Sequence, residues 1–101
     1  MNEFWRPESE IVLLIPSGVS DGEINFVGFR AWIRVLGRSS ARPEGTPERL
    51  GRELSCLIRC EAYPVPGTEF EWENIRYAIR RTVIRRDMGD RMVAYQCMAG
   101  E

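Results

Sequence analysis

One stretch decides the fold of this chain: residues 70–98, which read FEWENIRYAIRRTVIRRDMGDRMVAYQCM. Apolar and charged residues alternate in residues 69–73, and Ile75, Tyr77 and Ile79 alternate with arginines and Ala78 in a second segment that reaches about Ile84, which is the period-2 pattern of a half-buried strand. An Asp/Gly cluster at residues 87–90 is typical of a turn, because Asp bonds its own backbone and Gly adopts positive φ without strain. Residues 92–98 then form a third apolar segment. The stretch therefore predicts three consecutive strands joined by short turns.

The upstream part of the chain supplies further strands. Residues 11–15 form a short apolar strand that Pro16 ends, and residues 17–22 form a loop rich in turn formers. Residues 24–36 predict a long strand and residues 53–63 another. Short turns and alternation favour antiparallel pairing, and closure removes exposed sheet edges. The sequence predicts an all-β fold, a small antiparallel β-barrel of about six strands with one long loop and at most a short helical turn.

The same alternation assigns an inward face to each strand. Apolar residues on that face are expected to form the core, and they include Val27, Phe29, Ile33, Ile58, Tyr77 and Ile79.

The three cysteines are expected to be free thiols. They are odd in number, and the chain lacks the layout of an exported protein. Cys56 and Cys60 lie four residues apart on one predicted strand, hence about 13 Å apart at 3.3 Å per residue. That separation exceeds the roughly 7 Å limit for bridging two Cα atoms.

The composition is that of one soluble globular domain: 101 residues, 44% hydrophobic and 29% charged. We expect a single domain over residues 1–101, with an extended N-terminal arm at residues 1–10 and a long inserted loop at residues 37–52. No apolar run approaches the roughly 20 residues of a membrane helix. The sequence therefore predicts no membrane association.

The residue types argue against catalysis. The chain has no histidine, which removes the commonest general base, and no C-x-x-C pair for a metal. It contains no phosphate-binding loop, dinucleotide fingerprint or nucleophile elbow. We therefore expect no enzyme activity, no catalytic residue, no cofactor and no metal.

The basic residues are all arginine, and the net charge is −1. Arginine is the better residue for interfaces and phosphates, but a GC-rich genome also drifts towards arginine codons. Both explanations remain open. The net charge argues against a dedicated nucleic-acid binder, which usually carries a strong basic excess.

Two segments are candidates for docking or binding. Residues 37–52 are too polar to be core, and loops of this length are usually functional or disordered. Thr46 and Pro47 there suit the start of one helical turn. In the N-terminal arm, Phe4 and Trp5 either lie on the core edge or dock onto a neighbouring molecule.

Three pieces of the sequence resemble phage head–tail joining proteins. Residues 29–35, FRAWIRV, are similar to the family's x-x-A-W-A-x-V strand, and the long insertion directly after them ends at Gly51-Arg52-Glu53-Leu54. Residues 70–79, FEWENIRYAI, resemble the family's strand, tight turn and R-Y-x-I strand. An Asp/Gly turn and a final apolar strand follow in both. The resemblance covers most of residues 10–98.

The resemblance implies a structural virion protein called a head-closure, stopper or head-completion protein. Such proteins form a homo-oligomeric ring, a hexamer or a dodecamer, between the portal–adaptor complex and the tail terminator or tail-tube protein. They retain packaged double-stranded DNA and provide the tail attachment surface. The expected location is the head–tail interface of the virion, after assembly in the cytoplasm of a bacterial host.

The family's long loop projects towards the central channel, which in this chain corresponds to residues 37–52. The residues expected to face the channel or DNA are Arg38, Arg42, Glu44, Glu48, Arg49 and Arg52. Those expected to dock onto a subunit or partner are Phe4, Trp5 and Leu50.

Two alternative functions stay open. The first is a small nucleic-acid-binding barrel, in which Trp32 stacks on bases while Arg30 and Arg34 contact phosphates. The second is a tail-terminator-type ring protein, which shares the ring but has other partners.

Overall fold

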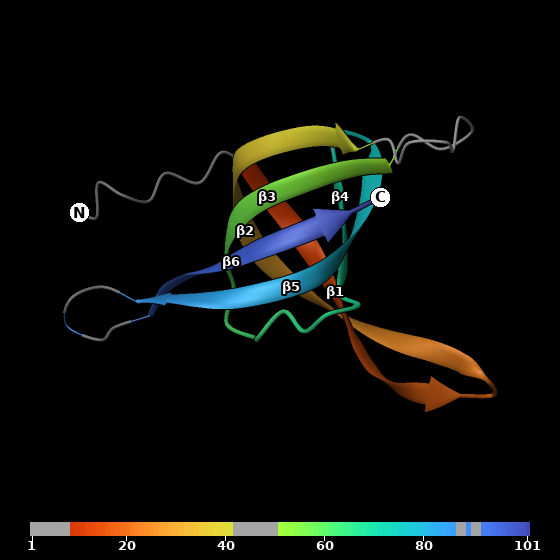
Figure 1. The fold of residues 1–101 in the computed structure, drawn as a ribbon. Coiled ribbons are helices and arrows are strands. Elements are labelled where there is room, and N and C mark those ends of the chain that lie inside the picture. Colours follow the sequence, from red (N-terminus) through yellow and green to blue (C-terminus); the bar gives the residue numbers. More distant parts are fainter. Residues whose placement is uncertain (1–8, 42–50, 87–88, 90–91) are drawn as a thin grey trace.

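Six antiparallel strands close into a barrel in the computed structural model, which describes residues 9–41, 51–86, 89 and 92–101 (Figure 1). Around the barrel the strands follow the order β1-β2-β3-β6-β5-β4. The described residues contain no helix, so the predicted all-β barrel is confirmed. The strands are β1 (Ser9–Ser20), β2 (Glu23–Ala41), β3 (Gly51–Arg59), β4 (Glu69–Trp72), β5 (Ile75–Arg86) and β6 (Met92–Gly100).

The meander predicted from residues 70–98 is present as β4, β5 and β6. Glu73 and Asn74 both have positive φ, 51° and 67°, and they connect Trp72 to its cross-strand partner Ile75. Two consecutive left-handed residues form the type I′ turn, whose twist matches that of the flanking strands. The turn therefore fixes the register of β4 on β5.

The prediction for residues 11–22 was wrong. β1 does not end at Pro16 but continues to Ser20, and only Asp21 and Gly22 form the turn to β2. Their φ values of 53° and 77° again indicate a type I′ turn. Proline is tolerated at sheet edges and bulges. Both conditions hold here, because the register shifts directly after Pro16 and the described ladder to β4 lies only at Leu14.

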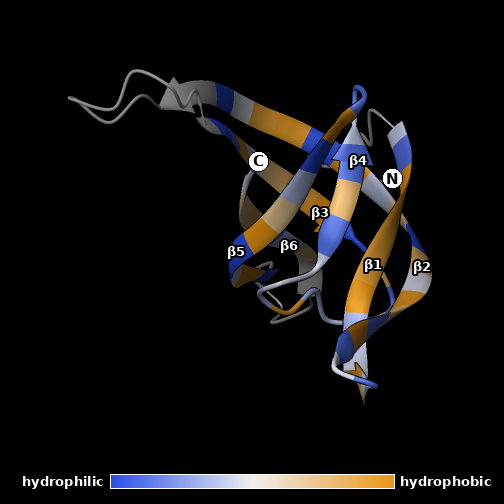
Figure 2. Cartoon of the chain, turned by 90° about the vertical axis from the view of Figure 1, so that its right-hand side faces the viewer, coloured by the Kyte–Doolittle hydropathy of each residue, from blue (hydrophilic) through white to orange (hydrophobic). Residues whose placement is uncertain are grey.

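The core lies inside the barrel, where one face of every strand points. Phe70 stacks on Tyr77 with ring centroids 5.7 Å apart. Of the six predicted core residues, Ile33, Ile58, Tyr77 and Ile79 are buried. Phe29 is only half-buried and Val27 is 45% exposed, because both lie where β2 leaves the barrel. Figure 2 shows the apolar run along β1, in which Ile11 and Leu13 are buried.

The described ends of the predicted loop at residues 37–52 are strand. β2 continues to Ala41, and β3 begins at Gly51, its cross-strand partner. A register shift between Val35 and Gly37 bends β2 as it passes this point. The helical turn expected near Thr46 lies outside the described residues.

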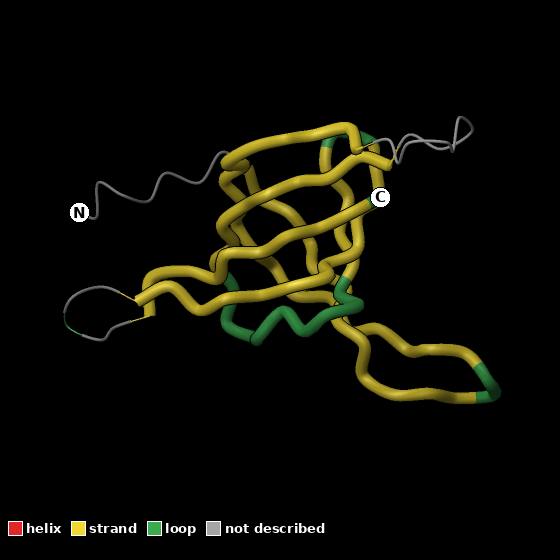
Figure 3. The backbone as a smooth tube through the Cα atoms, in the orientation of Figure 1, coloured by secondary structure: helices red, strands yellow, loops and turns green. Residues whose placement is uncertain are grey.

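β3 ends at Arg59 rather than at residue 63, and an irregular connection leads to β4 (Figure 3). The amide of Gly67 donates to the carbonyl of Ile79 at 2.8 Å, and the amide of Ile79 donates to the carbonyl of Thr68 at 2.7 Å. The Thr82 hydroxyl donates to the carbonyl of Pro64 at 2.7 Å. These bonds attach the connection to β5.

All three cysteines carry free thiols. Cys56 and Cys97 are directly opposite each other on β3 and β6, and both are buried. Burial raises the pKa of the Cys97 thiol to about 11 and raises that of Cys56 further. Both therefore behave as small apolar core residues.

Candidate interaction surfaces

A two-stranded ribbon projects from the barrel, formed by residues 15–27 of β1 and β2 (Figure 1). The barrel closes where Leu14 of β1 pairs with Glu69 of β4, and beyond Leu14 the described partner of β1 is β2 alone. A two-stranded hairpin is at best marginally stable by itself in water. Among the described residues both edges of the ribbon are therefore unpaired, since β3 joins β2 only from Trp32 onward, and residues 17–27 are exposed.

The ribbon exposes apolar side chains on both faces. On one face, Val19 pairs with Ile24, and the two are 72% and 58% exposed; Phe26 on the same face is 38% exposed. Val27 lies on the opposite face and is 45% exposed. Contiguous exposed apolar groups on a small domain are typical of interaction sites, so the ribbon is a candidate interaction surface.

The charge on the ribbon has one sign. Asp21 and Glu23 lie at its tip, and the chain has no basic residue between Ser9 and Phe29. Neither carboxylate makes an ion pair with a described residue. The ribbon is thus an apolar surface with an acidic tip.

A second surface lies on the outer wall of β5 and has the opposite charge. Arg81, Val83 and Arg85 alternate with half-buried Thr82 and with Ile84, which is 39% exposed, and Arg81 pairs across the sheet with Met98 of β6. Val83 and Met98 are each 41% exposed. No ion pair joins Arg81 or Arg85 to a described carboxylate. We call Arg81, Val83, Arg85 and Met98 the β5 face.

The Trp32 environment bears on the nucleic-acid alternative. Trp32 points outward from β2 and is 37% exposed. The Arg30 guanidinium lies 5.2 Å from the centroid of its ring. Glu10 accepts two hydrogen bonds from Arg30, at 2.6 and 2.9 Å, and these lower the pKa of Glu10 and raise that of Arg30. The Arg30 guanidinium, which Glu10 holds in place, therefore already covers one face of the Trp32 ring.

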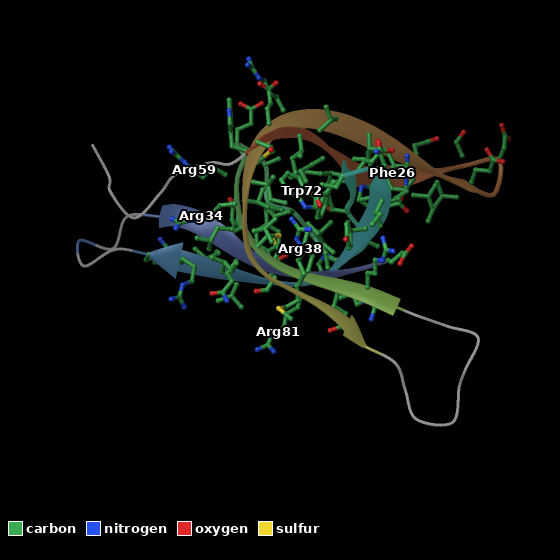
Figure 4. The ribbon with its side chains drawn as sticks, turned by 90° about the horizontal axis from the view of Figure 1, so that it is seen from above. Phe26, Arg34, Arg38, Arg59, Trp72 and Arg81 are labelled. Atoms are coloured by element: carbon green, nitrogen blue, oxygen red, sulfur yellow. The ribbon has the colours of Figure 1, made fainter. Side chains whose placement is uncertain are left out.

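Around Trp32, arginines occupy the neighbouring outward positions. Arg34 follows two residues along β2, and Arg59 of β3 is the cross-strand partner of Trp32 (Figure 4). Both arginines already interact with other groups of the chain. The cluster is basic and carries one aromatic residue.

Arg38 lies on β2 and not in a loop. Its guanidinium forms a bidentate ion pair with the carboxylate of Glu73 in the β4–β5 turn, with N–O distances of 2.8 and 3.2 Å. Seen from above, Arg38 extends over the barrel interior, where Trp72 also lies (Figure 4). This pair links β2 to a turn on the far side of the barrel opening. The indole N–H of Trp72 is buried with no hydrogen-bond partner among the described residues.

The other residues singled out from the sequence divide into two groups. Arg52 is an exposed residue of β3, and its carbonyl accepts a hydrogen bond from the amide of Glu101 at 2.9 Å. The rest lie outside the described residues: Phe4, Trp5, Arg42, Glu44, Glu48, Arg49 and Leu50. Their expected roles stay predictions.

Sequence reasoning missed both the ribbon and the β5 face. The signal for the ribbon was present, since Asp-Gly between apolar residues such as Val19 and Ile24 is the strongest short-range hairpin signal. The β5 face was visible as Arg81, Val83 and Arg85 at period 2. Neither pattern shows whether a strand segment lies in the barrel or projects from it, because that depends on where the sheet closes, which is at Leu14.

In comparisons with known proteins, no family model, curated protein or solved structure matches the chain. Among the described residues, no three acidic, cysteine or histidine side chains gather in a way that would hold a metal ion. The described part of the chain also has no helix long and apolar enough to span a membrane.

Proposed function

We propose that this chain is a structural subunit of a homo-oligomeric ring in the neck of a tailed phage or related particle. In this role it joins the head to the tail and helps to retain packaged DNA. The observation that carries the proposal is the ribbon, an apolar projection that a free monomer would leave exposed to water. In an assembly, such a projection can dock onto a neighbouring subunit and bury its apolar side chains.

The resemblance in the sequence supports the same role. FRAWIRV at residues 29–35 falls within β2, and FEWENIRYAI at residues 70–79 spans β4, its type I′ turn and the start of β5. The pieces that resemble head–tail joining proteins therefore occupy a strand and a hairpin of one closed barrel. The partners proposed by this resemblance are a portal–adaptor complex, a tail terminator or tail-tube protein, and double-stranded DNA.

The test is removal of the chain from a genome that encodes it, followed by electron microscopy of the particles. We expect separate heads and tails, with heads that have lost DNA, and restoration of joined particles by the chain supplied in trans. Closed, DNA-filled heads with tails of abnormal length would instead favour the tail-terminator role. Normal titre with normal particles would overturn any role in the neck.

A second candidate is a small nucleic-acid-binding barrel, which the arginines around Trp32 favour. Binding of this kind depends strongly on salt, because arginines that contact phosphates release counterions. Fluorescence anisotropy with a short single-stranded DNA, measured between about 50 and 200 mM salt, tests it. Weakened binding by Trp32→Ala and by higher salt would support this candidate, and absence of binding at low salt would exclude it.

A further inference from the structure

We propose that the ribbon of one copy of this chain docks onto the β5 face of the next copy. The contact is head-to-tail, with a different surface on each side, and it repeats from copy to copy. This inference rests on the proposed function for the idea that the repeat closes into a ring. The contact itself rests on the two surfaces.

The first argument is apolar burial. The ribbon exposes Val19, Ile24 and Phe26 on one face, and the β5 face exposes Val83 and Met98. Each surface leaves apolar area in water in an isolated copy. Contact between them would remove that area and would also support a hairpin whose two strands, beyond Leu14, pair only with each other among the described residues.

The second argument is charge. Asp21 and Glu23 make the ribbon tip acidic, while Arg81 and Arg85 make the β5 face basic, and none of the four pairs with a described residue of opposite charge. Contact between two ribbons would bring like charges together, as would contact between two β5 faces. Complementary charge suppresses such wrong contacts and sets the register of the correct one.

The third argument is placement. The ribbon and the far end of β5 leave the barrel on opposite sides (Figures 1 and 3). Phe26 and Arg81 likewise lie on different sides when the barrel is seen from above (Figure 4). One copy therefore offers both surfaces to two different neighbours. A heterologous contact of this kind generates a ring when its rotation closes and a filament when it does not.

The test uses charge reversal in the full chain and measures association by sedimentation equilibrium. One variant carries Asp21→Arg and Glu23→Arg, and the other carries Arg81→Glu and Arg85→Glu. Each leaves like charges at the contact, so each is expected to weaken association at least about tenfold. Combined in one chain, the four changes restore opposite charges and should return association to within about threefold of the original.

The two variants also provide a test by mixing. Alone, each has two surfaces of the same sign and should stay monomeric. Mixed in equal amounts, they have opposite charges at every junction and should assemble with the two variants alternating. The matched control is Glu71→Arg, an exposed glutamate on β4 outside both surfaces, which should change association little. Circular dichroism establishes that each variant keeps the β fold.

Three results would overturn the contact. The first is a chain that stays monomeric at millimolar concentration. The second is an effect of the ribbon variant with none from the β5-face variant, which would indicate contact between two ribbons. The third is failure of both the four-residue combination and the mixture to restore association.

Experiments on particles separate this inference from the proposed function. If joined particles require the chain but tolerate both reversed variants, the neck role stands and the contact is wrong. If the purified chain assembles through these surfaces but particles form normally without it, the contact stands and the neck role is wrong.

Discussion

Ile58 is the residue whose truncation best measures the barrel core. It is the next-to-last residue of β3, is fully buried, and pairs across the sheet with Ile33 on one side and Tyr95 on the other. Ile58→Ala removes three carbons, each contributing about 0.8 kcal/mol when buried, which gives about 2.4 kcal/mol. Strands on both sides limit collapse, so a residual cavity of about 50 Å³ adds about 1.2 kcal/mol at about 24 cal/mol per Å³. The expected loss in the free energy of unfolding is about 3–4 kcal/mol.

Urea unfolding followed by tryptophan fluorescence measures this loss, because Trp72 is buried in the barrel and becomes exposed on unfolding. The matched control is Val12→Ala on β1, which also shortens an apolar β-branched side chain but at a position 55% exposed. Its cost should stay below about 0.5 kcal/mol. Should Ile58→Ala fail to fold, Ile58→Val provides the same test at about 0.5–1.5 kcal/mol.

Two outcomes would contradict the reasoning. A loss below about 1 kcal/mol for Ile58→Ala, with an unchanged urea dependence, would mean that the residue does not face a packed interior. A loss at Val12 equal to that at Ile58 would mean that inward and outward faces are exchanged, which a one-residue register shift produces.

The thiols give a prediction about reactivity: with a thiol-reactive dye at neutral pH, half-buried Cys60 should react first, while Cys56 and Cys97 should react only after denaturant is added. Equal rates for all three in the native protein would contradict the burial. A second prediction concerns pH. Burial raises the pKa of Cys97 to about 11 from an ordinary 9.0, so above pH 9 the unfolded chain holds fewer protons than the folded one. The free energy of unfolding should therefore fall as pH rises from about 9 to 11, by about 1 kcal/mol per such thiol at pH 10, and a Cys97→Ala variant should show a smaller fall. A third concerns Gly22, which has φ 77° with open space around it, so that Gly22→Ala strains only the backbone. At about 1 kcal/mol, this strain should speed amide exchange in the ribbon about fivefold, whereas unchanged exchange would contradict the type I′ turn.

The sequence by itself determined the number of strands and several of the buried core positions. Alternation at period 2 placed Ile33, Ile58, Tyr77 and Ile79 on inward faces, and all four are buried. Local chemistry was sufficient there, because a strand has only two faces and one of them must be apolar. The alternation and the short turns likewise indicated an all-β fold, which the barrel confirms.

The tertiary structure decided where each strand leaves the barrel. Val27 continues the apolar alternation of β2 and was expected in the core, yet it is exposed. The barrel closes where Leu14, the partner of Gly28, pairs with Glu69, and Val27 lies on the ribbon side of that point. Pro16 similarly looked like the end of a strand, but it lies in the ribbon, where its missing N–H is tolerated at a register shift. Closure depends on pairing between residues more than 50 positions apart in the chain, and a local pattern carries no information about such a distant partner.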